Sequence, residues 1–539
     1  MEIFPLLLIS FIIIFCVLLN KVTSKIGMPM LLAFILLGMV FGEDGVFKIA
    51  FDDYDFAEKI CSVSLVFIIF YGGFGMRWKA AKPVAVKAIV LSTAGVVATS
   101  LLTGAFCYFF LHFPLIESFL TGSVIGSTDA ASVFYILRSK RLNLKYNTAS
   151  LLELESGSND PFSYMLTILF ITLLKGTASC GSVIYMVFSQ IVYGGFFGVV
   201  IALGGIFIYK RLRLSSGFDA AFVLAVSLLS YSASEFVGGN GYLSTYITGI
   251  IMGNANIDGK KSLVPFFDGT TGIMQMLIFF LLGLLSNPSK LIPVAIPSLL
   301  CALFLTFVAR PIAVFFLMGS FKCKLRQMFL ISWSGLRGAA SIVFAIIAIM
   351  SGITLENDLF HITFGIVLFS ILLQGTLLPY LSKKLKMLDD KENVLKTFTD
   401  YTEETPVQFI KVTVPEKHPW AGNEIRTLTL PPESLLVLIN RNGEKIIPRG
   451  TTMINAGDTL VLCAGSLAGP NESLVENDLL EIHIDEKHEF YNKTLSTITI
   501  DKNTLIVMIM RKGRVLIPTG STKFNAGDIA VIEQLKQVN

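Results

Sequence analysis

Long apolar runs fill the first 387 residues of this chain and restrict what it can fold into. Each run is close to the roughly 20 residues that an α-helix needs to cross a bilayer, and short polar loops separate the runs. Only 15% of all residues are charged, whereas soluble domains carry roughly 25%. We therefore expect an all-α polytopic membrane domain at residues 1–387, with about thirteen transmembrane helices. These helices are expected at residues 3–20, 28–45, 58–76, 84–111, 114–137, 147–174, 183–209, 218–237, 241–256, 265–286, 291–319, 328–352 and 358–382.

Basic residues are concentrated in alternate loops of this domain. The loops after the odd-numbered helices hold two to four Lys or Arg residues each, as at 138–145 and 322–326. The intervening loops hold few, and one of them contains the acidic segment FDDYD at 51–55. Because cytoplasmic loops carry the excess of Lys and Arg, this pattern predicts an external N-terminus, a cytoplasmic C-terminus and an odd number of helices. The small net charge of +4, without a dense basic block, argues against a nucleic-acid partner.

The remainder of the chain is polar at first and then contains an internal repeat. Residues 388–405 are expected to form a linker. The segment at 435–462 aligns without gaps with the segment at 505–532, and 14 of the 28 positions are identical. In each copy, apolar strands alternate with turns whose glycines supply a permissive backbone. We expect a cytoplasmic α/β, β-rich domain made of two copies, at 406–470 and 471–539.

The segment LLELESGSNDPF at 151–162 places ionisable groups in a run that is otherwise suited to lipid. A charge near the centre of a bilayer costs several kcal/mol, so ionisable groups there usually have a function. Glu155 and Asn159 are four residues apart, as are Ser156 and Asp160, and each pair therefore shares a helix face. Asp160 lies about midway along the expected helix and is the strongest candidate for a functional carboxylate.

Two other expected helices combine polar residues with glycines. Thr128 and Asp129 lie in the middle of the fifth helix, and Arg337 lies between two glycines at the start of the twelfth. Non-helical backbone at membrane depth is tolerated only inside protein or beside a cavity. We expect both helices to be broken and to cross. An offset of seven helices pairs the fifth with the twelfth, which is the inverted-repeat arrangement of secondary transporters.

The other charged residues of the membrane domain have structural interpretations. Glu155 and Arg337 are expected to form a buried ion pair, with direct contact to a transported ion as the alternative. Arg310 is expected near the cytoplasmic end of the eleventh helix, where its side chain can reach the membrane surface. Glu153 and Glu235 are expected near helix ends, without a role in transport.

Three motifs in order give the membrane domain a resemblance to a known family. The Thr-Asp of the fifth helix, the Glu-Ser-x-x-Asn-Asp of the sixth and the Gly-Leu-Arg-Gly-Ala of the twelfth resemble those of the NhaP-type monovalent cation:proton antiporters. The likeness covers about residues 1–385. It implies that Asp160 binds either a cation or a proton, and that Glu155 and Arg337 are the stabilising pair. The implied oxygen-rich site consists of Asp160, Asn159, Ser156, Thr128 and Asp129, with Asp160, Thr128 and Ser156 as ligands of the transported cation. The Gly-Ser at 157–158 is a departure, since many relatives have apolar residues there.

The tail resembles the TrkA-C or RCK-C regulatory domains of potassium-conductance regulators, through its Arg-x-Gly, Ile-Pro-x-Gly-x-Thr and Ala-Gly-Asp elements. Such domains tend to dimerise and to bind small effectors. The resemblance therefore implies a homodimer through both domains and a nucleotide-type effector of the tail. No GxGxxG follows a strand, so the companion NAD-binding domain is not expected. The combination resembles the bacterial potassium/proton antiporters, which implies a multi-pass protein of the bacterial inner membrane, in contact with the lipid bilayer and without a cofactor.

The same residues indicate how exchange would be coupled. A proton and a cation cannot both occupy Asp160 favourably, and Asn159 cannot titrate, so the site supplies one exchangeable charge. We expect electroneutral exchange of cytoplasmic K+ for protons, regulated by the tail, with Na+/H+ exchange as the first alternative. A ligand-gated cation channel is the second alternative. An enzyme is not expected, because the chain lacks the GxGD and HExxH motifs of intramembrane proteases.

Overall fold

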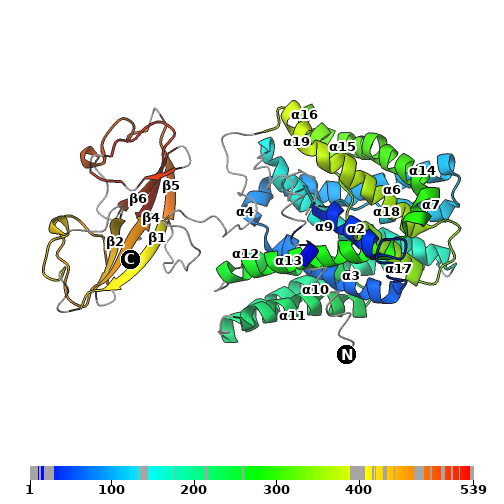
Figure 1. Cartoon of the computed structure of the whole chain (residues 1–539), viewed down its shortest axis with the longest axis horizontal. Coiled ribbons are helices and arrows are strands. Elements are labelled where there is room, and N and C mark those ends of the chain that lie inside the picture. Colours follow the sequence, from blue (N-terminus) through cyan, green and yellow to red (C-terminus); the bar gives the residue numbers. More distant parts are fainter. Residues whose placement is uncertain are drawn as a thin grey trace. The chain divides into compact units, whose positions relative to one another are not determined.

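The computed structural model divides the chain into two compact units, Met1–Tyr401 and Thr402–Asn539 (Figure 1). The first unit is helical and the second is built mainly from strands, which confirms the expected fold class. The described residues are 10, 14–16, 18, 30–129, 132–133, 144–176, 178–212, 217–255, 257, 260–388, 407–415, 418, 420–428, 434–441, 444–465, 479–485, 488–498, 504–511, 514–516, 518–520 and 522–534. Apart from Leu388, the expected linker at 388–405 lies outside this set.

The helices of the first unit follow the expected apolar runs. They are α2 (Met30–Phe41), α3 (Tyr54–Phe74), α4 (Trp78–Ala81), α5 (Ala85–Val90), α6 (Val96–Leu111), α7 (Leu115–Val124), α9 (Thr148–Leu174), α10 (Cys180–Leu212), α11 (Phe218–Phe236), α12 (Gly241–Asn254), α13 (Lys260–Leu285), α14 (Pro288–Phe304), α15 (Arg310–Gly319), α16 (Leu325–Trp333), α17 (Ala339–Met350), α18 (Leu359–Ser370) and α19 (Thr376–Lys384). Short 3-10 turns form at η1 (Lys82–Val84) and η3 (Lys145–Asn147), and π turns at η2 (Leu91–Gly95), η4 (Leu305–Ala309) and η5 (Ile371–Gly375).

Six helical segments among the described residues are long and apolar enough to cross a membrane. This number is lower than the thirteen spans expected, and the difference has local causes. The helices α2 and α12 have only 12 and 14 residues, and the fifth and twelfth expected helices are interrupted. The helices α9 and α11 have 27 and 19 residues and are long enough, but they are not apolar enough to be counted. Of the first expected span, the described residues 10, 14–16 and 18 are helical.

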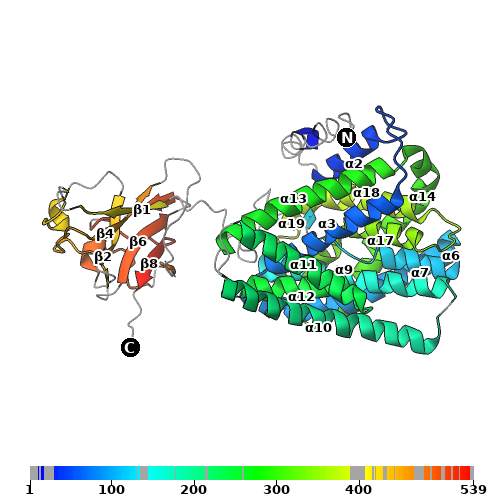
Figure 2. The ribbon, with the colours of Figure 1, turned by 90° about the horizontal axis from the view of Figure 1, so that it is seen from below.

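Glycines bring several of these helices into backbone contact. A Cβ on Gly73 of α3 would lie 2.5 Å from the carbonyl oxygen of Tyr246 in α12, and a Cβ on Gly38 of α2 would lie 2.2 Å from that of Phe280 in α13. Small residues allow this close approach where helices pack without a hydrophobic driving force from water. The helices α10, α11 and α12 also pack side by side (Figure 2).

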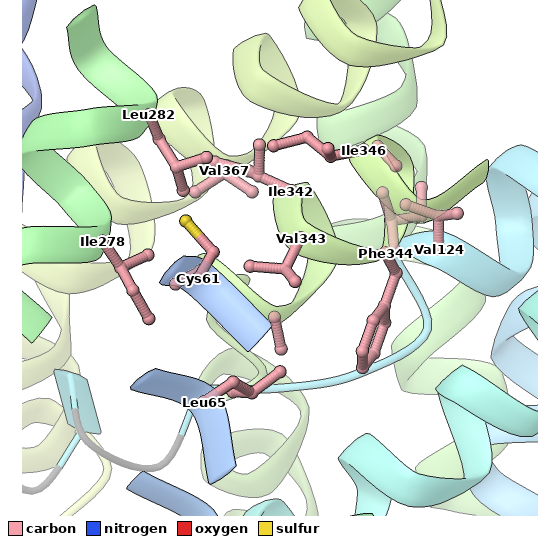
Figure 3. Close-up of a cluster of buried hydrophobic side chains, with 14 of the residues drawn as sticks. Cys61, Leu65, Val124, Ile278, Leu282, Ile342, Val343, Phe344, Ile346 and Val367 are labelled. Carbon is pink, nitrogen blue, oxygen red and sulfur yellow. The ribbon is translucent and has the colours of Figure 1, made fainter. Parts of the chain in front are cut away.

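A cluster of buried apolar side chains fixes α17 against α3, α13 and α18 (Figure 3). Every labelled side chain in the cluster is at most 2% exposed: Cys61, Leu65, Val124, Ile278, Leu282, Ile342, Val343, Phe344, Ile346 and Val367. Val124 is the last residue of α7. The cluster therefore packs around the end of α7, just before the first chain break, and around α17, just after the second.

Both helices that were expected to be broken are broken. Helix α7 ends at Val124, and residues 125–129 are not helical. Helix α16 ends at Trp333, and α17 begins at Ala339 after a non-helical stretch at 334–338. The segment before each break, Lys82–Leu111 or Pro288–Gly319, contains a π turn. The same order of features thus occurs twice, at the offset of seven helices expected for inverted repeats.

The second unit contains two sheets with the same topology. The first consists of β1 (Val407–Thr413), β2 (Ser434–Arg441), β3 (Glu444–Ile446) and β4 (Thr459–Gly465), in the order β1-β4-β2-β3. The second consists of β5 (Leu479–His483), β6 (Thr504–Arg511), β7 (Arg514–Leu516) and β8 (Ile529–Gln534), in the order β5-β8-β6-β7. All pairs are antiparallel, and the register slips at equivalent points, between Leu436 and Leu438 and between Ile506 and Met508. The sequence duplication is therefore also a duplication of structure.

Candidate cation site at the crossing of two broken helices

Helix α9 carries most of the candidate residues and is disturbed in its middle. Pro161 lies inside the helix and has no N–H to donate to the carbonyl of Gly157, one turn earlier. The carbonyl of Pro161 accepts a hydrogen bond from Nδ2 of Asn240 at 2.7 Å. A Cβ on Gly157 would lie 2.8 Å from the ring of Tyr246. The Gly-Ser departure therefore lets α12 approach α9 closely, directly beside the candidate residues.

Asp160 is held by the break in the fifth helix. The hydroxyl of Ser127 donates to Oδ1 of Asp160 at 2.6 Å. Ser127 is 1% exposed, whereas Asp160 is partly exposed. None of the residues that the structure describes donates a hydrogen bond to the second oxygen, Oδ2. A partly accessible carboxylate with one uncommitted oxygen can take up either a proton or a cation.

Three other predicted site residues form one hydrogen-bonded group next to Asp160. Nδ2 of Asn159 donates to Oγ1 of Thr128 at 2.5 Å, and Oγ1 of Thr128 lies 2.9 Å from Oγ of Ser156. Because Thr128 accepts from the amide, its own hydrogen is available to Ser156. All three side chains are buried, and Oδ1 of Asn159 has no partner within the described part of the chain. A buried acceptor of this kind calls for a bound water or ion.

Asp129 lies at the crossing, and its carboxylate bonds within its own segment. The N–H of Asp129 donates to the carbonyl of Leu336 at 2.8 Å, which joins the two breaks. The hydroxyl of Ser132 donates to one carboxylate oxygen, and the N–H of Ser132 lies 3.3 Å from the other. A Cβ on Gly338 would lie 2.6 Å from Oδ2 of Asp129. The glycine thus makes room for this carboxylate, whose charge also acts on that of Asp160.

The expected ion pair between Glu155 and Arg337 is wrong, because Glu155 pairs with Arg310. An Nη2 hydrogen of Arg310 is donated to Oε1 of Glu155, and both side chains are almost fully buried, at 2% and 0% exposed. Arg310 was expected to reach toward a membrane surface, but its side chain is buried instead. The helical segment Pro288–Gly319 continues well beyond it, and a Cβ on Gly335 would lie 3.0 Å from Nε of Arg310. The first glycine of the Gly-Leu-Arg-Gly motif therefore makes room for Arg310.

Arg337 instead binds the backbone of the opposite break. Its Nη1 donates to the carbonyls of Gly126 and Ser127, at 2.7 and 2.5 Å, and its N–H donates to Oγ of Ser370 at 3.0 Å. These carbonyls belong to residues that follow the end of α7, where backbone acceptors lose their helical partners. Arg337 is thus a partner for the interrupted fifth helix rather than for Glu155.

Sequence reasoning missed two side chains of this crossing, Ser127 and Ser132, and expected Arg310 at a membrane surface instead of beside Glu155. Ser127 precedes Thr128 directly, and helical spacing gave no reason to choose it. The non-helical backbone turns adjacent residues in unrelated directions, so Ser127 faces Asp160 while Thr128 faces Ser156 and Asn159. The Gly-Ser-Thr-Asp run itself was the only available signal.

Comparison with known proteins places this geometry in a family. The family model described as "Sodium/hydrogen exchanger, transmembrane" matches residues 10–384, and the TrkA-C domain model matches residues 409–466. The K(+)/H(+) antiporter NhaP2 of Shewanella sp. (strain ANA-3) is 33% identical over 451 residues, which are 82% of this chain and 78% of that protein. The K(+)/H(+) antiporter NhaP of Alkalimonas amylolytica is 30% identical over 512 residues, which are 91% and 89% of the two chains.

A solved structure supports the fold independently. The sodium proton antiporter MjNhaP1 from Methanocaldococcus jannaschii matches with a TM-score of 0.62 at 24% identity, covering 70% of this chain and 100% of that one. The helical unit therefore has the fold of that transporter. Because the family model matches residues 10–384, most of the chain, this protein belongs to the sodium/hydrogen exchanger family of membrane transporters. It carries a TrkA-C domain after its membrane unit.

Proposed function

We propose that this protein exchanges cytoplasmic K+ for external protons by competition of the two ions for Asp160. The observation that carries the proposal is the position of Asp160, a partly exposed carboxylate at the crossing with one oxygen bonded to Ser127. The relatives named K(+)/H(+) antiporters favour K+. Na+ is the alternative, favoured by the description of the family as a whole.

The oxygens around Asp160 would replace the hydration shell of the cation. Thr128 and Ser156 supply hydroxyl oxygens, and Asn159 supplies the uncommitted Oδ1. Broken helices present backbone dipoles at such sites in transporters. Asp129 acts on the site through its charge and through the geometry of the break, because its own carboxylate is bonded to Ser132.

Electroneutral exchange is proposed because one side chain carries the exchanged charge. Asn159 cannot titrate, and the buried charges of Glu155 and Arg310 compensate each other. Each turnover would then move one proton against one cation. Recordings on solid-supported membranes should show no sustained net current when K+ is added. A current that scales with the transport rate would contradict this stoichiometry.

The central test is the substitution Asp160→Asn in proteoliposomes with an internal pH-sensitive dye. K+-driven proton flux should fall to the level of empty liposomes. Asp219→Asn is the control, because Asp219 lies in the membrane unit on α11, outside the crossing, and its replacement can still accept the N–H of Gly217. Retained exchange in Asp160→Asn, with the control active, would contradict the proposal. Currents that persist in Asp160→Asn would instead support the cation channel.

Regulation by the tail is supported by the way the chain leaves the membrane unit. Leu388 pairs in an antiparallel bridge with Leu144, and the carbonyl of Met387 accepts from the N–H of Lys145 at 2.8 Å. Residues 145–147 lead directly into α9. The start of the tail connection is therefore hydrogen-bonded to the residues that lead into the helix carrying Asp160.

We propose that an effector, of nucleotide type, rearranges a tail dimer and thereby changes the activity of the membrane unit. Truncation after Leu388 should alter the transport rate, and Met387→Ser in the full chain should reproduce part of that change. Met387 is 1% exposed against Leu144 and the start of α9. The control is Leu377→Ser, at a position 38% exposed on α19. An unchanged rate after truncation would contradict regulation by the tail.

We place the protein in the bacterial inner membrane, with its N-terminus outside and its tail in the cytoplasm. The support is the concentration of Lys and Arg in alternate loops. In this topology, the exposed Cys180 at the start of α10 lies outside. A membrane-impermeant maleimide should therefore label Cys180 in intact cells, and a Cys180→Ser variant should lose that labelling. Labelling only in inverted vesicles would reverse the topology.

A further inference from the structure

Ser127 contacts Asp160 more directly than the other hydroxyl residues at the crossing. Its Oγ lies 2.6 Å from Oδ1 of Asp160. Thr128 and Ser156 are bonded to each other, and Thr128 is bonded to Asn159. An ionised carboxylate can only accept hydrogen bonds, so the hydroxyl hydrogen of Ser127 points at Asp160.

The backbone at Ser127 is fixed from the opposite break. Nη1 of Arg337 donates to the carbonyl of Ser127 at 2.5 Å and to that of Gly126 at 2.7 Å. The next residue but one, Asp129, donates its N–H to Leu336 at 2.8 Å. Ser127 is 1% exposed and Arg337 is fully buried. The hydroxyl is therefore presented to Asp160 by a rigid connection between the two broken helices.

We propose that Ser127 determines how strongly Asp160 prefers a cation to a proton, and that Arg337 positions Ser127 for this role. A donor to a carboxylate stabilises its charged form, whereas a protonated carboxyl gains much less from the same donor. The bond occupies Oδ1 and leaves Oδ2 available to the cation. Ser127 therefore favours the form of Asp160 that binds a cation, without taking up both of its oxygens.

This inference rests on the proposed competition at Asp160 and predicts a specific kinetic signature. In Ser127→Ala, the K+ concentration for half-maximal exchange should rise about tenfold near neutral pH, the loss expected when a hydrogen bond to a charged group is removed. The maximal rate at saturating K+ should change by less than about twofold, because excess cation displaces the proton. The rise should shrink as pH increases, since fewer protons then compete.

The charged and titratable groups around Asp160 come from different elements. Asp129 lies in the same break as Ser127, and Tyr246 lies on α12, where its ring packs against Gly157. Neither changes in Ser127→Ala. An equal rise of the half-saturating K+ concentration at every pH would therefore indicate altered packing rather than altered competition between proton and cation.

Two further variants complete the experiment. Ser123→Ala is the matched control, because Ser123 is equally buried in α7 and donates to the carbonyl of Leu120 at 2.7 Å. It should leave the half-saturating K+ concentration unchanged. Ser127→Thr keeps the donor and should restore at least most of the wild-type value, and this variant also decides the matter if Ser127→Ala fails to fold.

The inference is overturned if Ser127→Ala matches Ser123→Ala, or if Ser127→Thr is as impaired as Ser127→Ala. It is also overturned if the change falls on the maximal rate alone. These outcomes differ from failure of the proposed function, which would show as exchange retained in Asp160→Asn. If Asp160→Asn is inactive while Ser127→Ala is unchanged, the site stands and only the role of Ser127 is lost.

Discussion

Buried carboxylates and their arginine partners form more hydrogen bonds in the tail than at the membrane crossing. In the tail, both oxygens of Asp458 accept from Arg441 at 2.8 Å, and Oδ2 also accepts from the N–H of Asn455 at 2.8 Å. The second repeat copies this arrangement with Asp528, Arg511 and Asn525. At the membrane crossing, Glu155 and Arg310 share one contact, and Oε2 of Glu155 and Nε of Arg310 have no partner among the described residues.

This difference follows from what each charge does. A bidentate arginine–carboxylate pair with an added backbone donor is saturated, so it fixes one geometry. In the tail, this pair ties the Ala-Gly-Asp turn to the end of the second strand in each sheet. At the crossing, Oδ1 of Asn159 and Nη2 of Arg337 have no hydrogen-bond partner within the described part of the chain, and both lie near the accessible carboxylate of Asp160. Incomplete bonding leaves room for an ion that must enter and leave.

The largest effect is expected from breaking the pair between Glu155 and Arg310. Arg310→Met should destabilise the membrane unit by about 3–5 kcal/mol, because it leaves Glu155 buried without a partner. The double variant Glu155→Met/Arg310→Met should recover much of that loss. Chemical unfolding of the detergent-purified protein measures both. Arg326→Met, at an exposed position, is the control and should change stability by less than about 0.5 kcal/mol.

Arg337 provides the contrasting case for that prediction. It is equally buried but binds carbonyls rather than Glu155. Combining Glu155→Met with Arg337→Met should therefore give no recovery. Recovery in this combination, and none with Arg310→Met, would show that Glu155 pairs with Arg337 after all.

A smaller effect is expected from opening the saturated pairs of the tail. Asp458→Ala and Asp528→Ala should each cost about 1.5–3 kcal/mol, as expected for hydrogen bonds to a charged group. The two losses should agree closely, because the repeats place the same atoms at nearly the same distances, 2.8 Å in the first and 2.7 Å in the second. Equilibrium unfolding of the tail polypeptide, residues 402–539, followed by circular dichroism, provides the comparison. Clearly unequal losses would mean that the repeats are not energetically equivalent.

The smallest expected effect is the acid sensitivity of the same two carboxylates. The hydrogen bond from Arg441 lowers the pKa of Asp458. Burial opposes this at Asp528, yet the bonds from Arg511 and Asn525 still lower the pKa of Asp528. A carboxyl whose pKa is lower in the folded state stabilises the fold above the unfolded pKa, about 3.9 for aspartate. That stability is lost as pH falls through the folded pKa.

The melting temperature of the tail polypeptide should therefore change little near neutral pH and fall steeply below about pH 4. In Asp458→Asn/Asp528→Asn, the melting temperature should start lower and depend less on pH in that range. A double variant that keeps the full acid dependence would assign the effect to other carboxylates.

The fold was predictable where local pattern determines it. Apolar runs of spanning length and the charges of the loops predicted the helical unit, and the sequence repeat at an offset of 70 residues predicted the duplicated sheets. Polar residues flanked by glycines predicted both helix breaks. Each of these features depends on residues that are near each other in the sequence.

The site was less predictable where distant backbone determines it. Asp160, Asn159, Ser156 and Thr128 do lie together. The predicted partner of Glu155 was wrong because sequence spacing does not show which of two arginines, on distant helical segments, comes within reach of Glu155. Ser127 was missed because side-chain direction in a non-helical break does not follow a period. Both errors concern tertiary geometry rather than residue type.

The most direct test of competition at Asp160 is proton release on cation binding. K+ is added to purified, weakly buffered protein near neutral pH while a pH indicator is monitored. The wild-type protein should release protons with K+ binding, up to one proton for each cation bound, and Asp160→Asn should release none. Binding of K+ without proton release, or equal release from Asp160→Asn, would contradict the shared site.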